Sequence, residues 1–242
     1  MMKKPLLLSV VTLTTPLLLG TSRVLAAEQP TSVQNNGADP NSAQTTVTTT
    51  LTLNQTVTKP VAPTGPGNGG ADKVTDINGL FGIAYAPESF NASAQLSDDG
   101  QQEIPLQNTK STQNKFNIGV QDKTRQNDHQ WTLKAKLAWT GDTNGYMNGT
   151  TITASSGAVS ENVNGTLKTF TGTAPVSTNA SNLTIGQTAE TEIMKSTNGQ
   201  TMNGVYNYQF QSPKLVIPNV KTVTSGTYNG VINWNLENTP NP

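Results

Sequence analysis

Few side chains in this 242-residue sequence could carry chemistry, and the aromatic rings are the most conspicuous of them. The chain contains three tryptophans, one histidine and no cysteine. Two of the tryptophans open a Trp-x-Leu tripeptide, a repetition that is unlikely by chance in a chain so poor in tryptophan. A flat indole face can fill a protein core or lie against an apolar ligand surface. The candidate site residues are Trp131, Thr132, Leu133, Trp234, Asn235 and Leu236 of the two tripeptides, with Trp139 and Tyr228.

Catalytic side chains are not arranged in any pattern that indicates an enzyme. His129 lies in a polar segment, and we interpret it as an isolated surface residue. A catalytic triad also needs a positioned nucleophile and a buried carboxylate, and the sequence has no Gly-x-Ser-x-Gly elbow. The carboxylate pair Asp98-Asp99 is typical of a turn, and Glu190 and Glu192 would share one strand face. We therefore expect no enzymatic activity and no cofactor.

Metal and nucleic-acid sites are also not indicated. Two Asp-x-Asn-Gly stretches, at 76–79 and 142–145, resemble fragments of calcium loops but lack the rest of the pattern. Asn-Gly turns explain both stretches better, and the second is a strong hairpin signal. No basic stripe is interleaved with aromatic residues, so we expect no nucleic-acid partner.

The two tripeptides must be positioned by strands, because each lies in a run of strict alternation. Period-two alternation of apolar and polar residues is typical of a half-buried β-strand. One run places Trp131, Leu133, Ala135, Leu137 and Trp139 on one face. The other run places Tyr228, Gly230, Ile232, Trp234 and Leu236 on one face.

Shorter runs of the same kind recur along the chain, with turn residues between them. No segment of helical length has apolar residues at three- and four-residue spacing. About ten short strands predict an all-β fold, a single-domain β-sandwich or barrel. The further predicted strands lie at 81–85, 92–96, 116–120, 206–210 and 215–217, with weaker ones near Ile152, Leu167, 183–185 and Ile193.

The N-terminal residues 1–26 have the parts of a secretory signal: Lys3 and Lys4, an apolar stretch and small residues near Ala26. That stretch is too short and interrupted for a membrane span, which needs about 20 apolar residues. Its removal would leave 12 basic and 15 acidic residues, a net charge of −3. The absence of cysteine excludes disulfides and a lipid anchor on cysteine.

The segments that follow predict a flexible leader over 27–44 and one folded domain over 45–242. Val47, Thr49, Leu51 and Leu53 alternate with threonines, which favours a first strand. A threonine-rich, mucin-like stalk is the alternative for this stretch. Three prolines and four glycines between Lys59 and Gly70 predict a loop that joins no sheet.

The motifs together resemble the WxL domain of surface proteins in low-GC Gram-positive bacteria. The resemblance extends from about Thr45 to the C-terminus. Besides the two tripeptides, it rests on an acidic-to-basic stretch, an aromatic-glycine pair and a C-terminal signature. These are Val120–Arg125, Phe81-Gly82, Leu215-Val216-Ile217-Pro218, Gly226-Thr227-Tyr228 and Ile232–Leu236.

The resemblance implies a secreted protein held non-covalently at the cell wall and surface through peptidoglycan. It also implies association with other WxL proteins and a membrane-anchored partner. The alternative function is a structural subunit of a surface assembly, held by protein partners and contributing to host or matrix adhesion. Two interpretations of the tryptophans stay open: packing in the core, or stacking of the indole on the apolar face of a sugar ring.

Overall fold

The computed structural model describes residues 42–56, 58–197 and 200–238, and the chain divides into two units, 1–51 and 52–242. The predicted signal and most of the predicted leader lie outside these described residues. The described part of the first unit is exposed and forms no strand. Val47 and Leu51 are 84% and 88% exposed. The predicted first strand at 45–53 is therefore wrong, because alternation supplies a suitable strand but not a partner for its backbone.

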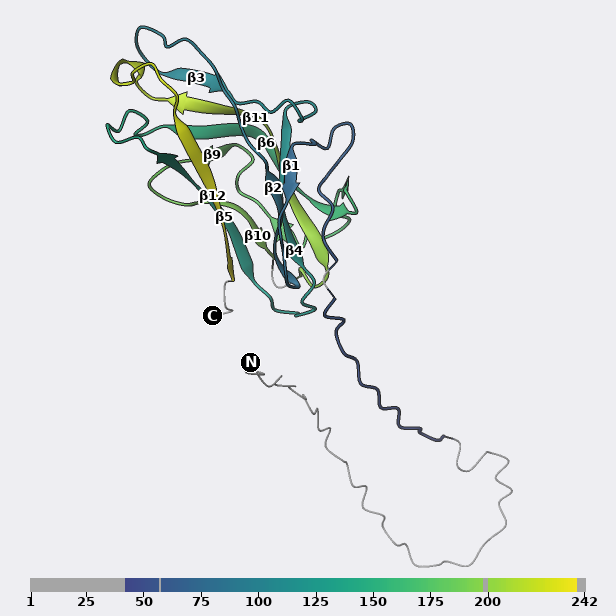
Figure 1. Ribbon diagram of the computed structural model, residues 1–242. Coiled ribbons are helices and arrows are strands. Elements are labelled where there is room, and N and C mark those ends of the chain that lie inside the picture. The colour runs from purple at the N-terminus through teal and green to yellow at the C-terminus, as the bar shows by residue number, and fades with distance from the viewer. Residues whose placement is uncertain (1–41, 57, 198–199, 239–242) are drawn as a thin grey trace, which may run out of the picture. The chain divides into compact units, whose positions relative to one another are not determined.

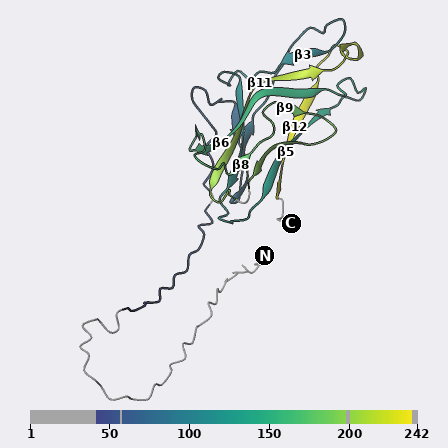
Figure 2. The same ribbon diagram turned by 180° about the vertical axis from the view of Figure 1, so that it is seen from behind.

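The second unit contains two antiparallel β-sheets, which confirms the predicted all-β class (Figures 1 and 2). The first sheet has the order β1-β2-β4-β11-β6-β7. Two further strands belong to it: β3 pairs with β11, and β9 pairs with β6. The second sheet has the order β12-β5-β10-β8. The strands are β1 Asp72–Val74, β2 Phe81–Pro87, β3 Gln102–Pro105, β4 Lys115–Asp122, β5 Trp131–Thr140, β6 Thr151–Val163, β7 Thr166–Lys168, β8 Val176–Ser177, β9 Leu183–Ile185, β10 Thr191–Ser196, β11 Gly204–Ile217 and β12 Asn229–Asn238, with a 3₁₀ turn η1 at Val220–Thr222.

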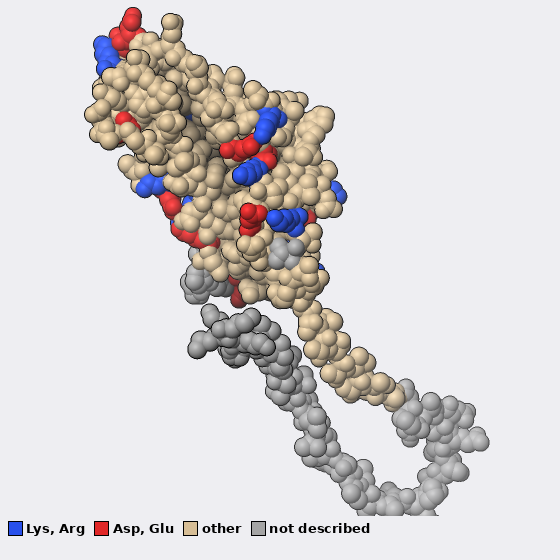
Figure 3. Space-filling view, in the orientation of Figure 1, with Lys and Arg blue, Asp and Glu red and all other residues tan. Residues whose placement is uncertain are grey.

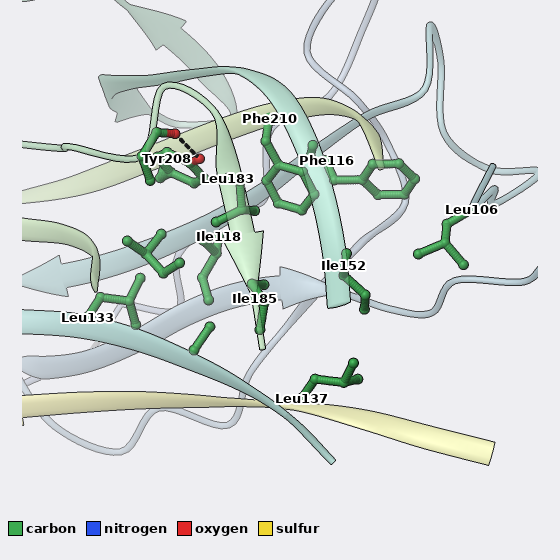
Figure 4. Packing of buried hydrophobic residues seen from close by; sticks show 14 of the residues in the cluster. Leu106, Phe116, Ile118, Leu133, Leu137, Ile152, Leu183, Ile185, Tyr208 and Phe210 are labelled. Atoms are coloured by element: carbon green, nitrogen blue, oxygen red, sulfur yellow. Dashed lines mark hydrogen bonds between the residues drawn. The ribbon is translucent and has the colours of Figure 1, made fainter. Parts of the chain in front are cut away.

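The core lies between the two sheets, where alternate side chains of facing strands meet (Figure 4). Leu133 and Leu137 point inward from β5 toward Ile118 of β4 and Ile185 of β9. Each such side chain contributes about 1.5–3 kcal/mol when it is fully buried. The aromatic part of the core includes Phe116, Trp131, Tyr206, Tyr208 and Phe210.

Two further strand predictions differ from the structure. Residues 92–96 form no strand, although Leu96 packs against the core, and only an isolated bridge joins Asn91 to Gln107. The Asn144-Gly145 turn closes no hairpin, because β5 and β6 lie in different sheets. There Asp142 accepts the amide protons of Tyr146 at 2.9 Å and Met147 at 2.8 Å, which turns the chain toward the other sheet.

The outer face of the first sheet is covered by the proline- and glycine-rich segment 59–70, which joins no sheet, as predicted. Asn162 donates to the carbonyl of Val61 at 2.7 Å, and the Thr64 amide donates to that of Gly165 at 3.2 Å. Beneath the segment, Tyr85 is fully buried and donates to Asn207 Oδ1 at 2.9 Å. Side-chain hydrogen bonds thus hold an irregular segment on a sheet face.

Tyr85 fits because Gly119 of β4 has no side chain. A Cβ atom there would lie 2.6 and 2.7 Å from two carbons of the tyrosine ring. Overpacking of this kind costs about 1–3 kcal/mol or more. We therefore expect Gly119→Ala to lower the free energy of unfolding by at least that amount, measured by urea denaturation. Gly186→Ala is the matched control, since a Cβ there meets nothing within 4 Å. Equal urea midpoints for the two variants would contradict the packing argument.

Candidate functional site

The two Trp-x-Leu tripeptides, 103 residues apart, lie side by side on neighbouring antiparallel strands. β5 and β12 pair over ten consecutive residues without a register shift. In this register Leu133 faces Leu236, and Trp234 faces Ala135. The first and third residues of each tripeptide therefore point to the inner face, and the middle residues Thr132 and Asn235 point outward. The sequence predicted both strands, and the fold joins them.

Trp131 is a core residue, with 1% of its surface exposed. Its ring lies 6.4 Å from that of Phe81 and 6.3 Å from that of Tyr206, measured between centroids. Its indole Nε1 donates to Thr201 Oγ1 at 3.0 Å. Leu133 is fully buried on the same face. For the first tripeptide, the structure supports the core-packing interpretation.

Behind Trp131 lies a buried polar network around the Asp122 carboxylate, which is closed to solvent. Thr201 donates to Asp122 Oδ2 at 2.8 Å, and His129 Nδ1 donates to the same oxygen at 2.8 Å. The other oxygen accepts the amide of Thr124 at 3.1 Å and its hydroxyl at 2.7 Å. The predicted surface position of His129 is therefore wrong. No pattern in the sequence indicates this network, because Thr201 is 79 residues from Asp122.

The remaining aromatic candidates come together in a groove of about 870 Å³. Trp139, Tyr228 and Trp234 are all half-buried and line it. Leu137 and Ile217 are among the lining residues that come from the two sheets. The segments 87–96 and 223–228 form its walls. Trp234 thus shares an inward face with Trp131 but is only half-buried, because β12 is the edge of its sheet.

Two contacts orient the rings at this groove. Trp139 Nε1 donates to the buried Thr150 Oγ1 at 2.8 Å. Across the strand pair, Gly230 leaves room for Trp139, since a Cβ there would lie 2.8 Å from the indole. The Tyr228 hydroxyl donates to the Thr224 carbonyl at 2.9 Å. Trp139 and Tyr228 are therefore held in place by contacts within the protein.

The outer face of the strand pair is occupied by its own polar contacts. Lys134 forms an ion pair with Glu237 at 2.6 Å and lies 4.0 Å from Glu190. The hydrogen bond that Lys134 donates to the Glu237 carboxylate raises the pKa of Lys134. Asn235 donates to Glu190 at 3.2 Å and to Glu237 at 3.1 Å. Figure 3 shows charged side chains in small mixed groups on a surface that is mostly uncharged.

Sequence reasoning did not identify the walls of the groove. Leu96 lines it from the segment 92–96 that was predicted as a strand, and Phe90 lines it from just before that segment. Val223 and Thr224 line it from the other wall. Among the described residues, no group of three or more histidine, aspartate or glutamate side chains could hold a metal ion. No helix in the described part of the chain has the length and hydropathy of a membrane span.

The two motif tryptophans should differ in their contribution to stability. Trp131→Phe removes a buried hydrogen bond and leaves a cavity, and we expect a loss of about 1–3 kcal/mol in the free energy of unfolding. Trp234→Phe changes a half-buried ring at an edge, and we expect a loss below about 1 kcal/mol. Urea denaturation followed by circular dichroism measures both. A larger loss for Trp234→Phe would contradict the assignment of core and groove roles.

The Asp122 network should be essential for folding. Asp122→Ala leaves His129 and two threonines without their acceptor in a buried site, which costs about 3–5 kcal/mol. The control is Asp128→Ala, which removes an exposed carboxylate from the neighbouring loop and should change stability by less than about 0.5 kcal/mol. Thermal unfolding of both variants checks this, and similar melting temperatures would refute it.

Comparison with known proteins identifies the family of the chain. A family model described as "WxL domain surface cell wall-binding" matches residues 38–240, which is most of the chain. No curated protein and no solved structure matches it. The matched range includes both tripeptides, the buried network and the aromatic groove. The chain therefore belongs to the WxL-domain family of cell-wall-binding surface proteins.

Proposed function

We propose that this protein is secreted from a Gram-positive bacterium and attaches non-covalently to its peptidoglycan, with glycan bound in the groove. The observation that carries the proposal is the placement of Trp139, Tyr228 and Trp234. These three half-buried rings line one groove of about 870 Å³, whereas Trp131 is enclosed in the core. Secretion is supported by the signal pattern of residues 1–26.

The chemistry of the groove suits an uncharged sugar chain. The axial C–H groups of a pyranose ring form an apolar face that can lie against an indole or phenol ring. Around that face, hydroxyl and amide groups of the sugar need hydrogen-bonding partners. Gln95, Thr224 and Ser225 among the lining residues provide such groups. A mixed aromatic and polar lining is typical of small-ligand sites.

The charge of the groove and of the whole chain favours the glycan as the ligand, rather than the anionic polymers of the wall. Among the described residues that line the groove, Glu88 is the one that carries a charge. It is paired with Lys110 at 2.6 Å and exposes little net charge to a ligand. After removal of residues 1–26 the chain has a net charge of −3, which gives no long-range attraction to polyanions. Stacking and hydrogen bonding are the proposed sources of affinity.

The proposed role is binding without catalysis. The Asp122–His129 pair resembles part of a catalytic triad, but both side chains are buried. The nearby hydroxyl of Thr201 donates to Asp122 and accepts from Trp131, so it is not placed as a nucleophile. The network supports the fold beneath the motif.

A second candidate is a structural role in a surface assembly held by protein partners, such as other WxL proteins or a membrane-anchored protein, with host or matrix adhesion as its outcome. The observation that favours it is the apolar part of the groove, where Phe90, Leu96 and Leu106 line a space that could also receive an apolar side chain. Binding to bare wall distinguishes the two candidates.

The test is co-sedimentation of the protein with peptidoglycan from which anionic polymers have been stripped by acid. We expect the wild type to bind. Trp234→Ala and Tyr228→Ala should each raise the apparent Kd about tenfold or more, the effect of losing about 1.4 kcal/mol of contact. Asn235→Ala, on the exposed outer face of the same strand, is the matched control and should bind like the wild type.

Near-UV circular dichroism must show that each variant keeps its fold. Absence of binding by the wild type would overturn the glycan proposal and favour protein partners. Release of soluble muropeptides during the assay would instead contradict a purely binding role.

A further inference from the structure

β12 is a long edge strand that lacks the usual protection against pairing with another chain. In the sheet order it pairs with β5 alone, through ten regular positions. Edge strands are usually kept short, bulged, or marked by proline or lysine. β12 has no proline, no lysine and no register shift, and its one charged residue is Glu237, close to its end.

The other terminal strands of the two sheet paths are protected. β1 and β7 have three residues each, and β8 has two. β1 and β7 also contain a lysine each, Lys73 and Lys168, which disfavours pairing with another chain. β12 is therefore the edge in the described structure where an added strand would gain a full ladder of backbone hydrogen bonds (Figure 1).

The same chain carries a segment with strand character and no partner. Thr45–Leu53 alternates apolar residues with threonine but forms no strand. Val47, Leu51 and Leu53 are among its exposed large hydrophobic residues, at 84%, 88% and 43% exposure. β-branched and alternating residues favour a half-buried strand. As long as Val47, Leu51 and Leu53 stay exposed to water, the chain lacks the stabilisation that burying them would give.

We propose that Thr45–Leu53 adds as a new edge strand to β12 of a second copy of this chain. Its nine residues match the ten residues of β12 in length. Its faces match as well, because the side chains of paired strands meet on the same face of a sheet. Val47, Leu51 and Leu53 would extend the inner row of Ile232, Trp234 and Leu236, which is half-buried at the open edge. Thr48, Thr50 and Thr52 would extend the exposed row of Val231, Asn233 and Asn235, and Thr49 would lie in the inner row with the apolar residues.

The anchoring of the following residues favours a second copy over the molecule's own edge. Val61 and Thr64 are hydrogen-bonded to Asn162 and Gly165, at the hairpin of β6 and β7. That hairpin belongs to the first sheet, whereas β12 is an edge of the second sheet. Residues 54–60 would have to lead from the first sheet to that edge to bring the segment back to its own β12.

The proposal is tested with residues 27–242, the chain that removal of the proposed signal would leave. Sedimentation velocity from about 1 to 100 μM, in the absence of glycan, should show association that increases with concentration. A double variant Val47→Lys/Leu51→Lys places charge on the apolar face of the segment and should weaken association at least tenfold. Thr48→Lys/Thr50→Lys adds the same charge to the opposite face and should associate like the wild type.

Hydrogen exchange read by mass spectrometry locates the contact. At associating concentrations, amide exchange should slow in two places, residues 45–53 and residues 229–238. A monomeric wild type at all concentrations would overturn the proposal. So would equal weakening by both double variants, or protection that appears at another edge in place of β12. Because no glycan is present, these outcomes are independent of wall binding.

Discussion

The ten-residue pairing of β5 with β12 is the constraint on which the rest of the site depends. It joins two segments far apart in the chain and aligns them so that both tripeptides turn the same residues inward. A shift of one residue would move every inward side chain to the outer face. Lys134, Asn235 and Glu237 would then enter the core without their present partners, which is a large cost. The inward apolar row and the outward polar contacts thus specify the same register.

The buried network around Asp122 connects the two sheets at one end of this pair. Asp122 ends β4 in the first sheet, and Trp131 begins β5 in the second. The Thr201 hydroxyl lies between them, accepting from the indole and donating to the carboxylate. A buried carboxylate is tolerated here because its oxygens accept four hydrogen bonds. The first tryptophan is therefore structural for a specific reason: its polar edge completes this network, and its ring fills the core.

The two copies of the motif have divided roles because their strands have different neighbours. β5 has β12 on one side and β10 on the other, and at its Trp131 end it is covered by the first sheet. β12 is an edge, so the side chains in its inward row remain partly open. At the far end of the pair, Trp139 and Tyr228 meet this open row and form an aromatic groove with almost no charge. One strand pair thus stabilises the sandwich at one end and lines the aromatic groove at the other.

The sequence by itself determined the all-β class and most strands, because period-two alternation records which face of a strand is buried. It also identified the tripeptides, Trp139 and Tyr228, whose residue types and repetition are visible without a fold. Only the tertiary structure decided which tryptophan is enclosed, because burial depends on the sheet that covers a strand. The same holds for Asp122, which meets His129 and Thr201 only after folding. The alternation at Val47 to Leu53 predicted a strand that does not form in one chain, since a strand also needs a partner edge, and pairing is not a local property of sequence.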